Sequence, residues 1–131
     1  MKLHNPTGLP APRGFNHGVE TPGGGRLLFV AGQIGCDQRG VVVSADIVEQ
    51  FERALRNAVE VVGAAGGSTA SIARLTIYTT DMVEYRSRLK GLGQGYRRVM
   101  GRHYPAMALL EVKGLFEPGA KIEVEATAVI P

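Results

Sequence analysis

The fold is decided by residues 26–34, which read RLLFVAGQI. Successive side chains of a β-strand point to opposite faces of its sheet, and in this strand both faces are apolar. A strand that is apolar on both faces must be covered on both sides. Helices can cover one face, and in so short a chain we expect a second subunit to cover the other. The two faces consist of Leu27, Phe29 and Ala31 on one side and of Leu28, Val30 and Ile34 on the other.

The segment that follows predicts an amphipathic helix. Asp46 is a typical N-cap residue, and Glu49 stands three residues later, which is the spacing of a capping box. Apolar residues then recur with the 3.6-residue period of a helix until the pair Gly66-Gly67 ends it. The apolar stripe consists of Ile47, Phe51, Ala54, Leu55, Ala58, Val59 and Val62.

A second helix is predicted over residues 82–100, again with an aspartate, Asp81, as its N-cap. Three glycines interrupt it, and each costs about 1 kcal/mol relative to alanine. Two interpretations stay open: the helix is continuous and its glycines permit a close approach to a neighbouring backbone, or the helix breaks there. The apolar stripe consists of Tyr85, Leu89, Leu92, Tyr96, Val99 and Met100, and the glycines are Gly91, Gly93 and Gly95.

The rest of the chain predicts short strands, turns and a looped arm. Residues 5–12 hold three prolines, which remove backbone donors and predict an irregular arm. Together with residues 26–34, the predicted strands give the order β-β-β-α-β-α-β-β over one domain, residues 1–131. Two helices on one face of a mixed sheet place the chain in the α+β class. The other strands are predicted at residues 19–20, 41–43, 71–80, 106–112 and 121–129.

Composition argues against several classes of protein. The formal net charge is +3, but the basic residues are dispersed among acids, so we expect no nucleic-acid site. One cysteine, Cys36, suits a reducing compartment. The N-terminus lacks the apolar region of a signal peptide, and no apolar run is long enough to span a membrane, so we expect a cytoplasmic protein. No Cys/His cluster has the spacing of metal ligands.

Five short strings occur in a fixed order along the chain. Each string alone is a weak signal, but together they resemble the RidA/YjgF family over nearly the whole chain. They are FVAGQI at 29–34, the helix segment 57–67 that begins NAV and ends AAGG, LTIYTTDM at 75–82, YPA at 104–106 and KIEVEA at 121–126.

The resemblance implies a chorismate-mutase-like fold and a homotrimer with a cleft at each subunit interface. In active members the cleft hydrolyses enamine or imine intermediates made by pyridoxal-phosphate enzymes, and it needs no metal or organic cofactor. Glu123 matches the pocket acid that positions or deprotonates water, and Gly32 matches a glycine whose backbone approaches the ligand. From the residues alone, Glu123 also reads as a strand carboxylate paired with Lys121, and Gly32 as a bulge or packing glycine.

Two positions depart from the family pattern. Active members carry an arginine after "PA", where its guanidinium grips the substrate carboxylate through two parallel hydrogen bonds; here the residue is Met107. A thioether suits an apolar part of a ligand, or plain packing. In the loop RGFNHG, residues 13–18, Phe15 stands where the family has a tyrosine, so a hydroxyl is also missing.

Other side chains near the matching motifs are candidates for the missing cation. Arg13, His17, Arg102 and His103 are the candidates, and each also reads as a solvated surface residue. His17 stands out because its loop matches a pocket loop and because a neutral imidazole can transfer a proton near pH 7. Cys36 reads either as a reactive thiol or as a small packing residue.

Three functions are compatible with these observations. In the first, an altered deaminase, Glu123 orients water, the backbone near Gly32 and Ala108 holds the substrate, and Met107 contacts an apolar substituent. In the second, the same cleft binds a small-molecule ligand without turnover. In the third, which ranks well behind, the cleft is occluded and the protein binds RNA or another protein.

Overall fold

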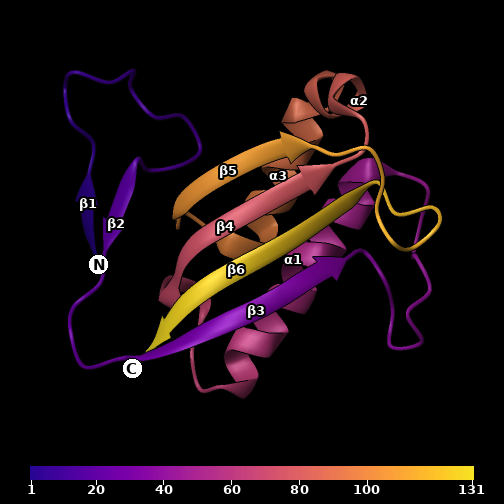
Figure 1. Ribbon diagram of the computed structural model, residues 1–131. Helices are drawn as coiled ribbons and strands as arrows, with labels where there is room; N and C mark the ends of the chain where they lie inside the picture. Colours follow the sequence, from indigo (N-terminus) through magenta and orange to yellow (C-terminus); the bar gives the residue numbers. More distant parts are fainter.

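Four strands form one mixed sheet in the computed structural model, which describes residues 1–131 (Figure 1). The spatial order is β3 (Arg26–Ile34), β6 (Ile122–Ile130), β4 (Ile72–Thr79) and β5 (Ala106–Glu111). Strand β6 runs antiparallel to both of its neighbours, whereas β4 and β5 are parallel. The expected α+β class with a mixed sheet is therefore confirmed.

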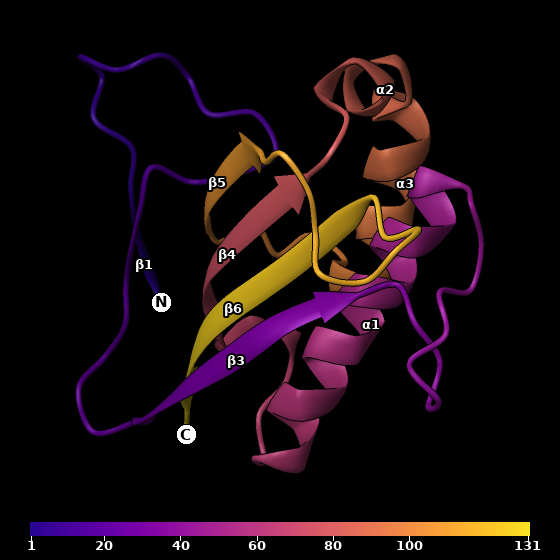
Figure 2. The same cartoon turned by 45° about the vertical axis from the view of Figure 1, so that its right-hand side comes forward.

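The helices all lie on one face of this sheet (Figure 2). They are α1 (Ile47–Ala64), α2 (Met82–Ser87) and α3 (Leu89–Met100), and a short 3-10 turn, η1 (Thr69–Ser71), precedes β4. The core lies between α1, α3 and the inward side chains of the strands; Leu55 and Leu75 are fully buried there. None of the helices has both the length and the apolar character that crossing a membrane requires.

Both predicted N-caps form, but the capping box with Glu49 does not, because the Asp46 backbone N–H donates to the Ser44 hydroxyl instead. The Asp46 carboxylate accepts a hydrogen bond from the Val48 backbone N–H at the start of α1, and the Asp81 carboxylate accepts one from Glu84 N–H at 2.9 Å at the start of α2. At the end of α1 the chain turns through Gly66, whose φ of 91° lies in the left-handed region that favours glycine. The sequence thus determined where α1 begins and ends.

The second helix is interrupted, but not at its glycines. The break is at Arg88, between α2 and α3, and α3 runs without a break through Gly91, Gly93 and Gly95. The Ser87 hydroxyl donates to the Glu84 carbonyl at 2.7 Å, a local bond that competes with the helical pattern. The prediction of one helix over 82–100 is therefore wrong at Arg88.

One of these glycines has a clear packing reason. A Cβ placed on Gly91 would stand 3.1 Å from Cγ2 of Val48, on the facing side of α1. The missing side chain thus lets α3 approach α1, although the neighbouring group is a side chain and not the backbone.

Two strand predictions at the N-terminal end need correction. Residues 41–43 form no strand and keep only an isolated bridge between Cys36 and Val42, because the Asp37 carboxylate accepts from the backbone N–H groups of Arg39 and Val41 and folds the segment into a turn. Conversely, β1 (Lys2–His4) pairs antiparallel with β2 (Gly18–Glu20) and was not predicted. All of β1 is exposed, so no apolar pattern marked it.

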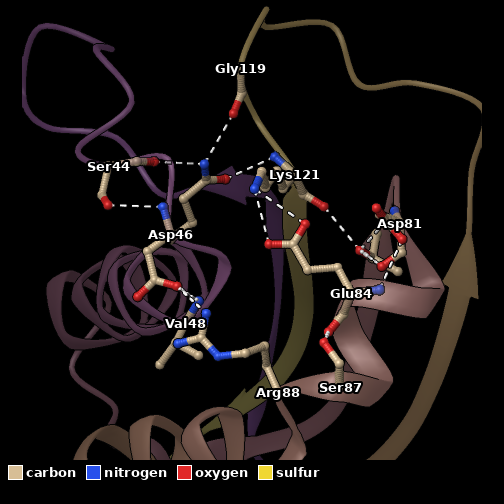
Figure 3. A network of polar contacts seen from close by, with 11 residues as sticks. Ser44, Asp46, Val48, Asp81, Glu84, Ser87, Arg88, Gly119 and Lys121 are labelled. Carbon is tan, nitrogen blue, oxygen red and sulfur yellow. Dashed lines mark hydrogen bonds and ion pairs between the residues drawn. The ribbon is translucent and has the colours of Figure 1, made fainter.

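A buried amide fixes the two loops that lead to α1 and β6 (Figure 3). Gln50 is fully buried; its Nε2 donates to the carbonyls of Ser44 (2.7 Å) and Gly119 (3.0 Å), and its Oε1 accepts from the Lys121 backbone N–H (2.8 Å). The Lys121 ammonium pairs with Glu84 of α2 at 3.0 Å. These contacts set the position where β6 starts.

The face of the sheet away from the helices has no cover within the chain (Figure 1). On it Phe29 exposes 75% of its surface and Leu27 65%, although the opposite side of the same strand is packed, with Val30 buried. Exposed apolar patches of this kind mark sites of association.

Candidate functional site

A hollow of about 490 Å³ opens between the β5 side of the sheet and helices α2 and α3. Its volume lies within the usual range of small-molecule pockets, about 300–1,000 Å³. The N-terminal loop adds Arg13 and Gly14 to its wall. The other lining residues are Phe51, Ile77, Tyr85, Leu89, Leu92, Gly93, Tyr96, Arg97, Tyr104 and Met107.

Met107 faces this hollow because of the way β5 pairs. It stands opposite Leu75 of β4, so both side chains point to the helix-covered face, and Met107 packs against the core. Ala108, the next residue, stands opposite Thr76 and faces the uncovered side of the sheet. Two residues predicted to contact one ligand therefore lie on opposite faces.

The loop that carries Phe15 and His17 docks on the start of β5. The Asn16 backbone N–H donates to the Pro105 carbonyl at 3.1 Å, and its side-chain amide donates to the Tyr104 carbonyl. Phe15 and His17 make an edge-to-face contact with ring centroids 5.2 Å apart. This docking places the loop beside the hollow, although neither ring lines it.

The remaining candidate cations have structural partners or lie elsewhere. His17 donates from Nε2 to the Pro10 carbonyl at 2.8 Å, within the N-terminal arm. His103 donates from Nε2 to the Ile72 carbonyl at 2.7 Å, and Arg102 is exposed; neither lines the hollow. Cys36 lies just past β3, where the Asn57 amide donates to its carbonyl at 3.1 Å.

Glu123 and Gly32 lie together in the fold. A bulge between Val30 and Gln33 interrupts the β3–β6 ladder and places Gly32 against Glu123. A Cβ on Gly32 would stand 2.7 Å from the Glu123 carboxyl carbon and from Oε1. The absent side chain at position 32 is what leaves room for this carboxylate.

Glu123 has no ion pair or hydrogen bond within the chain. Lys121, its expected surface partner, pairs with Glu84 instead. The neighbouring acid on the same face, Glu125, accepts a hydrogen bond from the Tyr78 hydroxyl at 2.6 Å, and this bond raises the pKa of Tyr78 above its ordinary value. Glu123 is therefore the acid of β6 that remains available to a ligand.

The hollow and the Glu123–Gly32 pair lie on opposite faces of the sheet. Glu123 alternates along β6 with the buried residues Ile122 and Val124, so its side chain faces away from the helices, whereas Met107 faces toward them. A single chain thus forms both parts of the predicted site without bringing them together.

Aromatic residues that the sequence did not single out form much of the hollow's wall. Tyr96 stacks on Tyr104 with ring centroids 5.2 Å apart, and its hydroxyl donates to the His103 carbonyl at 2.6 Å. Burial raises the pKa of Tyr96 and of Tyr85, so both remain neutral phenols at physiological pH. Tyr85 and Tyr96 were predicted on the apolar stripe, which gave no reason to place them beside a ligand.

No group of three or more histidine, cysteine, aspartate or glutamate side chains is arranged to hold a metal ion. The chemistry available is therefore that of one free carboxylate, two arginines and an apolar wall. Such a set can orient water, bind an anion and exclude solvent from an apolar group.

Comparison with known proteins gives a consistent result. Residues 8–130 match the family model described as Endoribonuclease L-PSP. The human 2-iminobutanoate/2-iminopropanoate deaminase is 30% identical over 105 residues, 79% of this chain and 73% of the relative. The crystal structure of YyfB from Yersinia pestis, of the conserved Rid protein family, is 31% identical with a TM-score of 0.87 over 98% of both chains. Escherichia coli TdcF with bound serine is 28% identical with a TM-score of 0.69 over 100% of both chains.

Proposed function

The chain belongs to the RidA/YjgF family and has its chorismate-mutase-like fold, and on that premise we propose that it is a hydrolytic enamine/imine deaminase of altered substrate range. The reaction takes place in the cytoplasm, in clefts between the subunits of a homotrimer, and uses no metal or organic cofactor. The relative named as a 2-iminobutanoate/2-iminopropanoate deaminase supports the reaction class.

One observation carries the proposal: the free carboxylate of Glu123, lying over Gly32 on the uncovered face of the sheet. A carboxylate without an internal partner is stable where water or a ligand solvates it. The exposed apolar side chains of Phe29 and Leu27 share this face, so association would enclose Glu123 in an interface.

The same association unites the two parts of the site. Glu123 and Gly32 of one copy face the hollow beside Met107 of another copy, and the cleft between them holds the substrate. Closed rings of three copies arise when the two contacting surfaces differ and the rotation between copies closes. The Glu123–Gly32 pair on the uncovered face of the sheet and the hollow on the helix-covered face are two such different surfaces.

The chemistry needs one well-placed base. Water attacks the imine carbon, a C–O bond forms and the electron pair of the C=N bond moves to nitrogen. The Glu123 carboxylate takes a proton from this water and passes it to the nitrogen, which gives a carbinolamine. The carboxylate then takes the hydroxyl proton and passes it to the amino nitrogen, and the electron pair of that O–H bond forms the C=O bond as the C–N bond breaks, so that ammonia and a 2-oxo acid leave. Positioned general bases contribute roughly 10²–10⁴-fold to such reactions.

Met107 is the residue that alters the substrate range. Its thioether cannot supply the two parallel charged hydrogen bonds that an arginine gives a carboxylate. It offers instead a polarisable apolar contact to the substrate's side chain. Small imino acids, which have little besides the carboxylate to bind, are therefore poor substrates.

The test is a coupled assay in which a pyridoxal-phosphate-dependent serine dehydratase makes the imine. Although this small imine is a poor substrate, formation of 2-oxo acid should still exceed spontaneous hydrolysis when the protein is added, and Glu123→Gln should remove that excess. Glu125→Gln is the matched control, because Glu125 lies on the same strand face but is bonded to Tyr78. Met107→Arg should raise the rate on the small imine. Acceleration that survives Glu123→Gln would sink the assignment of the base.

The second candidate is a binding protein that uses the same cleft without turnover, and the methionine at position 107 is the observation that favours it. It predicts a ligand of the hollow that binds equally well to the wild type and to Glu123→Gln, with no acceleration of imine hydrolysis by either. Neither function involves nucleic acid.

A further inference from the structure

Arg97 and Arg13 line the hollow without any acidic partner. No aspartate or glutamate stands among the lining residues, and neither arginine makes an ion pair or a hydrogen bond within the chain. Arg98, next to Arg97 in the sequence, pairs with Glu52 of α1. Of two adjacent arginines on α3, one is used to hold helices together and the other is left free at the hollow.

The side chain of Arg97 lies back along α3 toward the hollow. Side chains of a helix point toward its N-terminus, so residue 97 extends over residue 93. Gly93 has no side chain to obstruct it: the Arg97 Nη1 atom stands 3.6 Å from where a Cβ of Gly93 would be. Gly93 is itself a lining residue, so the guanidinium stands at the wall of the hollow.

The rest of the wall is apolar and wide. Leu92 and Met107 contribute aliphatic surface, Tyr85 is nearly buried, and the Tyr96 hydroxyl is occupied by the His103 carbonyl. A hollow of about 490 Å³ has room for a much larger molecule than an imino acid of three or four carbons. Cations at one side and an apolar wall at the other suit an amphipathic anion.

We propose that Arg97, assisted by Arg13, is the carboxylate anchor of this protein, in place of the arginine missing at position 107. The substrates are 2-imino acids with a large apolar side chain, aromatic or branched, which packs on Met107 and Leu92. This rests on the proposed function for the identity of the reacting group, but binding of the matching 2-oxo acid requires no turnover.

Binding of three probes to the full-length protein tests the proposal by calorimetry: phenylpyruvate, pyruvate and 4-phenyl-2-butanone, which keeps the ring but lacks the carboxylate. Phenylpyruvate should bind roughly tenfold or more tightly than either of the others. Arg97→Gln should weaken the binding of phenylpyruvate by roughly 10- to 100-fold, which is the contribution of a charge-assisted hydrogen bond. Arg98→Gln, which removes the neighbouring exposed arginine that is bonded to Glu52, should leave the affinity unchanged.

A second pair of variants tests the position of the guanidinium. Gly93→Leu keeps Arg97 but fills the space over which it lies, so phenylpyruvate binding should be lost. Gly95→Ala, on the same helix but outside the lining, places a Cβ in ordinary contact, 3.6 Å from the Glu52 Cβ, and should bind as the wild type does. Both changes favour the helix, so loss of folding is not the expected cause.

Two results would overturn the proposal: phenylpyruvate affinity that Arg97→Gln leaves unchanged, or pyruvate binding as tightly as phenylpyruvate. Its failure is distinguishable from failure of the proposed function. If the protein hydrolyses the imine but Arg97→Gln leaves phenylpyruvate affinity unchanged, only the role of Arg97 as carboxylate anchor is overturned. Arg97-dependent binding without imine turnover upholds the anchor and overturns the deaminase.

Discussion

Replacing Phe29 by aspartate should prevent association of the chain. Phe29 exposes 75% of its surface on the face of the sheet that no helix covers. Because a buried aromatic side chain removes about 150–250 Å² from water, covering the exposed part of Phe29 removes roughly 110–190 Å². At about 25 cal/mol per Å², this contributes about 3–5 kcal/mol per copy. With an aspartate at position 29 association no longer gains this hydrophobic contribution, and it must also bury a carboxylate, which is unfavourable.

The expected result is a dissociation constant raised more than about 100-fold, since each 1.4 kcal/mol is about a factor of ten. Sedimentation velocity over a range of protein concentrations measures it. The wild type should sediment with three times the mass of the chain and Phe29→Asp with the mass of one chain, with unchanged circular dichroism.

Val83→Asp is the control, because Val83 is 77% exposed but lies on α2, away from the uncovered face. A Phe29→Asp protein that still sediments as a trimer would refute the reasoning, since Phe29 would then not lie in the interface.

Three further predictions concern single residues. Gly32→Ala should leave the free energy of unfolding nearly unchanged but abolish imine turnover, because its Cβ would displace the Glu123 carboxylate; retained turnover in the coupled assay would contradict this. Gly35→Ala should destabilise by about 1–3 kcal/mol in urea unfolding, because its Cβ would stand 2.5 Å from the Gln50 Cα, whereas Gly23→Ala, with nothing near, should not. Asp46→Asn keeps a capping side chain but loses the ion pair with Arg88. The hydrogen bond from Arg88 lowers the pKa of Asp46 below 3.8, and at pH 7 the substitution should lower the free energy of unfolding by at most about 1 kcal/mol. This difference in the free energy of unfolding should shrink as the pH falls from the unfolded-state pKa of Asp46 through its lower folded-state pKa, because the protonated carboxyl no longer pairs with Arg88. If urea unfolding shows the same difference between wild type and variant at low pH, the ion pair is not its cause.

The local elements could be predicted because their signals lie within a few residues. Caps such as Asp46 and Asp81 and the alternation along β6 are set by neighbours in the sequence. The break at Arg88 escaped prediction because it depends on the side chain of Ser87 bonding back to a carbonyl. The pairing of Lys2–His4 escaped because an exposed strand carries no apolar pattern.

The sequence suggested candidate site residues but not how the fold arranges them. Glu123 and Gly32 lie side by side because of a bulge in β3, which was not visible in the sequence. Met107 faces the helices only because β5 pairs with β4 in one particular register, a contact between distant segments. Arg97 was not singled out in the sequence; its spacing of four from Gly93 was the available signal, and a single helix position rarely identifies a site.

Activity of mixed oligomers tests most directly whether the site is built from two copies. Glu123→Gln and Arg97→Gln each disable one part of the cleft, and the proteins are unfolded together and refolded at equal amounts. If each cleft combines the hollow of one subunit with Glu123 of another, random mixing leaves about a quarter of the clefts with both parts intact. The account predicts recovery of about a quarter of the wild-type rate of imine hydrolysis. Mixed oligomers that form but stay as inactive as their parents would contradict it.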